Sequence, residues 1–157
     1  MEKYTVSEKD FATDLRYHRE LHREWKEFNK KNKIGYFQIF NNDFSKILPH
    51  LSGNAVKLYV HLGSFANSHT GECTVSVERL TKDLNCSKRA IQNWLKELSD
   101  FNLIARKQLG YKTRTHTFLL PYNQEFLKKS APYSKIAKDI IEDAIETKNN
   151  NLNDDLF

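Results

Sequence analysis

Three stretches in the middle of the chain have apolar residues at every third or fourth position, which is the spacing of an amphipathic helix. The first, from Ser52 to Asn67, places an apolar stripe at Ala55, Leu58, Tyr59, Leu62 and Phe65. The second stretch has an apolar face at Val77, Leu80 and Leu84. The third has one at Ile91, Leu95 and Leu98, with Trp94 at its edge. The residues that can cap the three helices are Ser52 or Asn54, Ser76, and Ser87. The pattern therefore predicts three helices with defined starts.

An interruption at Asn85-Cys86-Ser87 separates the second helix from the third. Two short helices joined by a turn of three or four residues can cross steeply, and neither has enough apolar surface to be stable alone. We therefore expect Leu80 and Leu84 to pack on the third helix, with the first helix closing the core. This packing leaves an outward face on the third helix, which carries Lys88, Arg89, Gln92, Asn93 and Lys96.

Two strand candidates follow at 103–109 and 114–120, with Gly110 in the loop between them. This spacing predicts a β-hairpin that ends at Pro121. A further short strand is predicted at Cys73-Thr74-Val75. The order helix, strand, helix, turn, helix, hairpin is that of a winged helix-turn-helix. The predicted fold class is therefore mainly α with a small β-hairpin (α+β), with helical extensions at both ends.

The two ends of the chain predict further helices. An amphipathic pattern runs from Asp10 to Lys31, with Gly35 as its predicted end, and its partly buried seam is formed by Phe11, Leu15, His18, His22, Trp25 and Phe28. A last helix is predicted from Tyr133, Ile136, Ala137, Ile140, Ile141, Ala144 and Ile145. The predicted organisation is an N-terminal helix at 1–33, a winged domain at 34–122, a helical extension at 123–147 and a disordered, Asn-rich tail at 148–157.

Positive charge is concentrated in the predicted winged domain. The chain has a formal net charge of +5, and residues 53–122 hold 10 Lys/Arg against 5 Asp/Glu. Such a balance favours a polyanionic partner, here double-stranded DNA. Arg can pair bidentately with guanine and Gln or Asn with adenine, whereas Lys and a helix N-terminus mostly contact phosphate. The candidate DNA-binding residues are Ser87, Lys88, Arg89, Gln92, Asn93, Lys96, Arg106, Lys107, Lys112 and Arg114.

The segment from Leu51 to Tyr122 resembles the winged helix-turn-helix family. It is similar to the N-terminal domain of replication initiators and replisome organisers of plasmids and phages in Gram-positive bacteria. The matching stretches are GNAVKLY at 53–59, SVERL at 76–80, SKRAIQ at 87–92 and NLIAR at 102–106. The family often has Ala where Thr81 stands, and Gly where Asn85 and Asn102 stand. Asn is the next best residue for a left-handed backbone, so these two departures are mild, whereas Thr81 predicts looser packing.

The resemblance implies a sequence-specific DNA-binding protein of a mobile genetic element, acting in replication initiation or its control. A transcriptional repressor of its own operon would use the same domain. A protein-binding adaptor would keep the winged fold while its terminal helices grip another protein. We expect a homodimer, because two half-sites multiply weak binding, with the N-terminal helix as its candidate contact. The acidic segment 123–157 is expected to dock against the basic domain or to bind a protein partner.

Other residue patterns predict no enzyme, metal or cofactor. His18 and His22 are four residues apart, but Arg19 stands where a zinc-protease motif has Glu. The two cysteines, Cys73 and Cys86, do not form a CxxC pair, so free thiols are expected. No glycine cluster forms a phosphate-binding loop. The polar start of the chain and the lack of an apolar run of ~20 residues predict a cytoplasmic protein without a membrane span.

Overall fold

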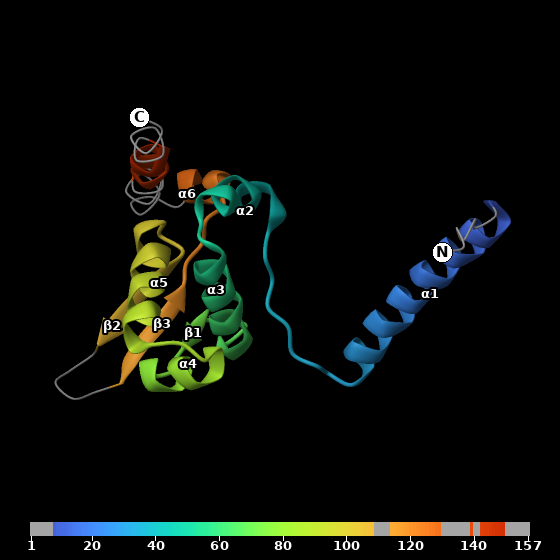
Figure 1. Cartoon of the computed structure of the whole chain (residues 1–157), viewed down its shortest axis with the longest axis horizontal. Coiled ribbons are helices and arrows are strands. Elements are labelled where there is room, and N and C mark those ends of the chain that lie inside the picture. The colour runs from blue at the N-terminus through green and yellow to red at the C-terminus, as the bar shows by residue number, and fades with distance from the viewer. Residues whose placement is uncertain (1–7, 109–113, 130–138, 140–141, 150–157) are drawn as a thin grey trace, which may run out of the picture. The chain divides into compact units, whose positions relative to one another are not determined.

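The computed structural model describes residues 8–108, 114–129, 139 and 142–149, and separates a unit of residues 1–36 from a unit of residues 37–157. The described part of the first unit contains one helix, α1 (Glu8–Lys31), as the sequence pattern predicts (Figure 1). The predicted extent of the helix to about Lys31 is confirmed, but the predicted role of Gly35 in ending it is wrong. The helix ends at Lys31, and Lys33 turns the backbone with a φ of 53°. The N–H of Ile34 then donates to the carbonyl of Asn29 across 3.0 Å, which satisfies a carbonyl of the last turn.

The apolar side of α1 is exposed, although the sequence predicts a partly buried seam with Trp25 and Phe28 as packing residues. Leu21 is 48% exposed, and Trp25 and Phe28 are each 59% exposed. His18 and His22 are also exposed. A lone helix has no second element in its own unit against which to bury this side. The periodicity therefore predicts the helix correctly but not the burial of its seam.

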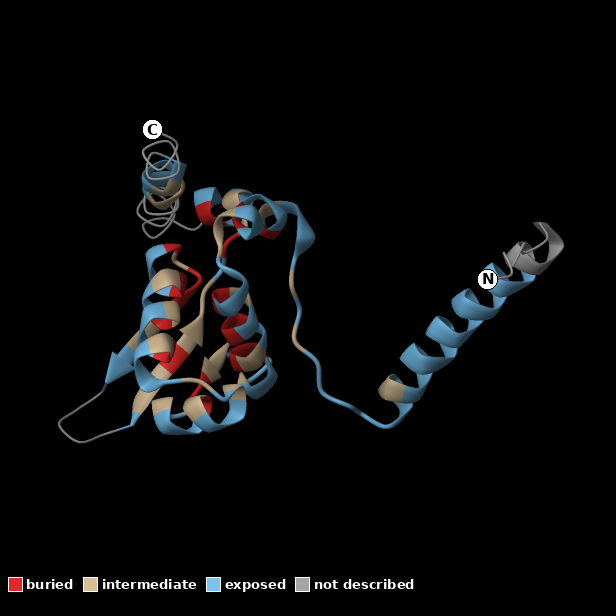
Figure 2. Cartoon of the chain, viewed as in Figure 1, coloured by how far each residue is buried: buried red, intermediate tan, exposed pale blue. Residues whose placement is uncertain are grey.

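Three helices form the core of the second unit: α3 (Gly53–Phe65), α4 (Val77–Leu84) and α5 (Lys88–Asp100). Their predicted apolar faces are largely buried, as Figure 2 shows in red, but Phe65 at the end of α3 is 43% exposed, and Val77, Leu84 and Trp94 are half-buried. The residues with at most 1% exposed surface include Leu58, Leu62, Leu80, Ile91 and Leu98. Burial of such a side chain stabilises a fold by roughly 1.5–3 kcal/mol. This core fixes the position of α5 relative to α3 and α4.

Each of these helices begins at the serine that the sequence predicts. The Oγ atoms of Ser52, Ser76 and Ser87 accept hydrogen bonds from backbone N–H groups three residues later, at 3.2, 3.1 and 3.1 Å. The turn between α4 and α5 depends on Asn85, whose φ of 49° and ψ of 57° place it in the left-handed region. Asn102, after α5, has a φ of 54°. The expectation that both Asn residues adopt the backbone conformation favoured by Gly is thus confirmed.

A three-stranded antiparallel sheet flanks the helices, with strand order β1-β3-β2. The strands are β1 (Glu72–Cys73), β2 (Ile104–Gln108) and β3 (Thr115–Leu119). The predicted hairpin is confirmed, because Ile104 pairs with Leu119 and Gln108 with Thr115. The first strand lies one residue earlier than predicted and does not include Thr74 or Val75. The hairpin tip at 109–113, with Gly110 and Lys112, lies outside the described residues.

Short helices before α3 and after β3 contact each other. They are α2 (Asn41–Ile47), a 3₁₀ helix (Leu48–His50) that includes Pro49, and α6 (Gln124–Lys129). The Asp43 carboxylate accepts a hydrogen bond from the N–H of Gln124 across 2.9 Å. The Tyr122 hydroxyl likewise accepts one from the N–H of Phe40 across 2.6 Å. These contacts close the domain across a sequence separation of about eighty residues.

Residues 142–149 are helical, as the C-terminal amphipathic pattern predicts. The helix includes Lys148 and Asn149, two residues that the sequence assigns to the disordered tail. Ala144 and Ile145 are partly buried against the core, which explains why the chain remains helical there. The predicted apolar positions from Tyr133 to Ala137, Ile140, Ile141 and the rest of the tail lie outside the described residues.

Candidate nucleic-acid interface

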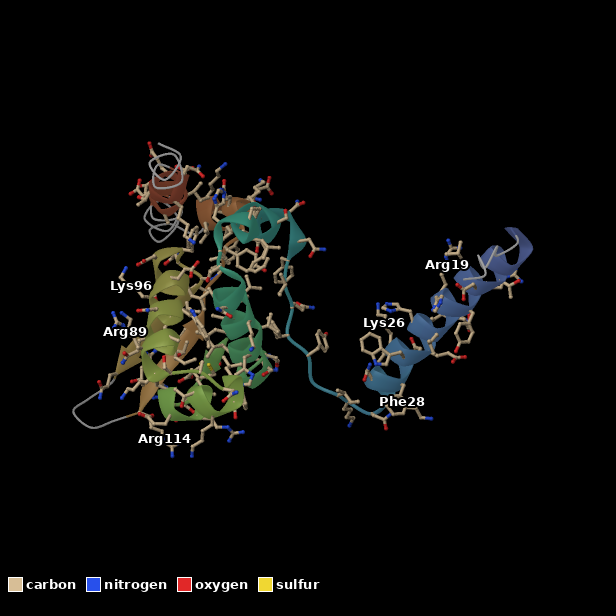
Figure 3. All side chains as sticks on the ribbon, in the orientation of Figure 1. Arg19, Lys26, Phe28, Arg89, Lys96 and Arg114 are labelled. Carbon is tan, nitrogen blue, oxygen red and sulfur yellow. The ribbon has the colours of Figure 1, made fainter. Side chains whose placement is uncertain are left out.

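Helix α5 presents its predicted outward face to solvent because its opposite face is buried. Leu95 and its neighbours Ile91 and Leu98 belong to one core cluster with Leu80 of α4. The five polar residues predicted for the outward face are all exposed: Lys88, Arg89, Gln92, Asn93 and Lys96. In Figure 3, Arg89 and Lys96 project from α5 on the side away from α3. The structure thus brings these five side chains to one surface.

The side chains of this face differ in whether they are already paired. Lys96 Nζ lies 2.7 Å from a carboxylate oxygen of Asp100, and Lys88 Nζ lies 3.6 Å from one of Glu78. By contrast, Arg89, Gln92 and Asn93 make no hydrogen bond or ion pair with another described residue. Exposed ion pairs contribute only about 0–1 kcal/mol, so both lysines can exchange their partners for another anion. The unpaired residues form the centre of the face.

The candidate DNA-binding residues of the hairpin do not all lie on one face of it. Lys107 and Arg114 are exposed, but Arg106 lies on the other face of β2, opposite the buried Thr117. Its Nε atom is enclosed and has no hydrogen-bond partner among the described residues. Burial lowers the pKa of Arg106, an effect that the nearby Cys73 opposes. Arg106 and Lys107 therefore point to different sides of the hairpin. Lys112 falls within the hairpin tip outside the described residues.

A concave pocket of about 680 Å³ lies between the starts of α4 and α5 and the two strands of the hairpin. Four of the predicted DNA-binding residues line it: Lys88, Gln92, Arg106 and Arg114. Arg79, which the sequence analysis missed, lines it as well. Its position in the first turn of α4, three residues after the cap Ser76, was the signal that could have revealed it. We call this pocket the hairpin pocket.

Arg79 is held in place by a carboxylate on its own helix. Its Nε donates to both carboxylate oxygens of Asp83, at 2.8 and 2.9 Å, and its guanidinium carbon lies 5.9 Å from the ring centre of Phe65. Hydrogen bonds from Arg79, and also from His61, lower the pKa of Asp83. Asp83 is thus ionised at neutral pH and joins α3 to α4. This contact orients the first turn of α4 beside the hairpin pocket.

A second groove, of about 800 Å³, lies between the C-terminal half of α5 and the helix at 142–149. Asn93 and Lys96 line it together with the acidic Asp143. The helix is anchored by Lys148, whose Nζ lies 2.7 Å from Glu97 and also donates to the carbonyl of His50. The described helix at 142–149 therefore contacts the winged domain, through a lysine of the C-terminal segment and a carboxylate of α5.

Glu97 connects three segments through one carboxylate. It accepts hydrogen bonds from the N–H and the Oγ of Ser52, both at 2.7 Å, and pairs with Lys148. Burial alone would raise the pKa of Glu97, but the Lys148 ammonium and the two Ser52 donors outweigh it and lower the pKa below its usual value. The ionised carboxylate thus fixes the end of α5 to the start of α3.

A family model described as a helix-turn-helix domain matches residues 50–104. This segment has the fold of a helix-turn-helix domain. The match runs from the 3₁₀ helix through α3, α4 and α5 to the first residue of β2, and the β2–β3 hairpin that follows makes the fold a winged helix-turn-helix, as predicted. The comparisons with curated proteins and with solved structures found no match.

The remaining sequence candidates lie away from this face. His116, a residue of β3, pairs with Glu72 of β1. Cys73 is buried, and this burial raises the pKa of its thiol, while Cys86 packs partly buried against the core as a small residue of the turn. Thr81 is accommodated by donating from its Oγ1 to the carbonyl of Glu78 across 2.7 Å. None of the described helices is long and apolar enough to cross a membrane.

Proposed function

We propose that the winged helix-turn-helix domain binds double-stranded DNA, with α5 in the major groove. The observation that carries this proposal is the outward face of α5, where Arg89, Gln92 and Asn93 are exposed and have no partner among the described residues. Guanidinium and amide groups are the side chains that pair bidentately with guanine and adenine. Since none of the described residues binds these groups, they are available to base edges.

The hairpin supplies a second contact beside the major groove. Lys107 and Arg114 are exposed on it, and Lys112 is placed near its tip by sequence. Such cations neutralise backbone phosphates, and each phosphate neutralised steepens the dependence of log K on log salt by about 0.9. We therefore assign specificity to α5 and sequence-independent affinity to the hairpin.

We further infer that the target is a specific site on a mobile genetic element, and that binding acts in replication initiation or its control. The resemblance of residues 51–122 to replication initiators and replisome organisers supports this role. A transcriptional repressor would use the same face of α5, so the location of the site separates the two roles. Footprinting on DNA of the source element tests this: protection at a replication origin supports the replication role, and protection confined to a promoter rejects it.

A homodimer would place two α5 helices on two half-sites of the DNA. We propose that the two protomers contact each other through α1. Its exposed apolar residues, among them Leu21, Trp25 and Phe28, support this assignment. Light scattering after size exclusion tests it on the full chain. We expect a dimer for the wild type and a monomer for Trp25→Glu, while Arg19→Glu on the charged side of α1 remains dimeric. A monomeric wild type at high concentration contradicts the assignment.

Fluorescence anisotropy with labelled duplex DNA tests the central proposal. We expect the affinity of the wild type to fall steeply between about 50 and 200 mM salt. Arg89→Ala is expected to lose about 1–3 kcal/mol of binding free energy. Lys57→Ala, which removes an exposed cation from α3, serves as the charge-matched control and is expected to bind like the wild type. A salt-independent affinity, or equal effects of the two variants, rejects DNA binding through α5 and favours the adaptor.

A further inference from the structure

The hairpin pocket holds more positive charge than the described residues neutralise. Arg79, Lys88, Arg106 and Arg114 line it, against the single carboxylate of Glu78. Asp83 satisfies Arg79 from outside the pocket, and Glu78 lies 3.6 Å from Lys88. Arg106 and Arg114 have no ion pair with another described residue. The pocket therefore has an unbalanced positive charge at the two hairpin arginines.

Arg106 occupies an unusual position for a surface cation. Its side chain lies on the inner face of β2, and its Nε is enclosed without a hydrogen-bond partner among the described residues. A guanidinium that is partly removed from water and left unpaired is destabilising, and a buried polar group normally has a partner. The planar N–H fork of Arg matches the oxygens of a phosphate, which can accept two parallel hydrogen bonds. Arg106 lines the pocket, so an anion there would bind the terminal N–H groups of its guanidinium, whereas the enclosed Nε is shielded from the pocket.

We propose that the hairpin pocket is a phosphate-binding site, in which Arg106 holds the phosphate from the enclosed side and Arg114 from the mouth. Lys88, in the first turn of α5, adds a third cation. The source of the phosphate rests on the proposed function: if the domain binds DNA, the group in the pocket is a phosphodiester of the DNA backbone, between the major groove and the hairpin. A free ligand that carries a phosphate offers the same chemistry.

Binding of inorganic phosphate without DNA tests the site itself. The full chain is titrated with sodium phosphate, and amide chemical shifts are followed by NMR against sodium chloride at matched ionic strength. We expect saturable shifts at 76–79, 88–92 and Arg106 in the wild type. Arg106→Gln and, at the exposed mouth, Arg114→Gln should each weaken them at least several-fold, while Lys57→Gln leaves them unchanged. Two variants are used because Arg114 is exposed and its replacement does not threaten the fold.

The same variants in the DNA assay identify the source of the phosphate. If Arg106→Gln also weakens duplex binding and reduces the salt slope by about one, the pocket takes a backbone phosphodiester. If duplex binding is unchanged while the phosphate shifts are lost, the pocket takes a free phosphate ligand. Phosphate shifts that do not saturate, or that persist in both variants, overturn the site, even if Arg89→Ala still weakens DNA binding. Saturable phosphate binding in a chain that does not bind duplex DNA would instead retain the site and reject the proposed function.

Discussion

Replacement of Glu97 by Ala should destabilise the second unit more than any exposed carboxylate would. The carboxylate is 18% exposed and accepts two hydrogen bonds from Ser52 while pairing with Lys148. A hydrogen bond to a charged group contributes about 1.5–3 kcal/mol, whereas a partly exposed ion pair contributes about 0–1 kcal/mol. The three contacts share one group and are not additive. We therefore expect a loss of about 2–3 kcal/mol in the free energy of unfolding.

Urea unfolding of the full chain, followed by circular dichroism, measures this loss as a lower midpoint at an unchanged m-value. Glu78→Ala is the matched control, because Glu78 is an exposed carboxylate at the start of α4 whose one ion pair among the described residues is with Lys88. The urea midpoint of the control should stay close to that of the wild type, because an exposed ion pair contributes little to stability. Equal losses for the two variants, or a loss below about 0.5 kcal/mol for Glu97→Ala, would refute the reasoning from shared contacts.

The contribution of Glu97 to the free energy of unfolding also depends on pH in a defined direction. Burial opposes ionisation of Glu97, but Lys148 and Ser52 prevail, so its pKa is lower in the folded than in the unfolded state. A group of this kind stabilises the fold above the unfolded pKa, about 4.3 for Glu, and the stabilisation is lost as the pH falls through the folded value. The difference in stability between wild type and Glu97→Gln should therefore be largest near neutral pH and shrink in acid. A difference that grows in acid contradicts the assigned direction.

Three further changes test the helix-turn-helix core. Asn85→Ala should cost about 1 kcal/mol because Ala is disfavoured at positive φ, whereas Asn85→Gly should leave the urea midpoint unchanged or raised. Ser87→Ala removes the cap of α5 and should also cost about 1 kcal/mol, with Ser87→Asn retaining most of the stability. Leu80→Ala opens a cavity at a residue with 1% exposed surface and should cost about 2–5 kcal/mol in urea unfolding, with Leu80→Met closer to the wild type.

Local sequence chemistry was sufficient to predict the helix-turn-helix itself. The serine caps, the buried faces of α3, α4 and α5, and the left-handed conformation of Asn85 each depend on residues within about one helical turn. The alternation of inward and outward side chains along β2 also predicts the face on which Arg106 lies. Because Ile104 is buried, Arg106 two residues later must lie on the same inner face. Its separation from Lys107 was therefore predictable.

Long-range contacts had no such local signal. The Glu97 carboxylate meets Ser52 across 45 residues and Lys148 across 51 residues, and no spacing in the sequence brings these groups together. The same holds for α1, where periodicity identifies an apolar side but not the surface that covers it. A third limit concerns the residue that follows α1. Gly is the residue most often found in a left-handed backbone conformation after a helix, but here Lys33 adopts that conformation at a modest energetic cost.

The two ends of α5 have different roles. Residues that contact DNA can therefore be distinguished by mutation from residues that position the helix. Its first half carries Arg89 and Gln92 toward the proposed DNA, while Glu97 near its end is anchored to Ser52 and Lys148. A helix of 13 residues is a rod of about 20 Å, so an anchor at one end fixes the direction of the side chains at the other. Loss of Arg89 should therefore weaken DNA binding without changing stability. Loss of the Glu97 anchor should weaken binding only as far as it loosens the fold, and equally for every DNA sequence.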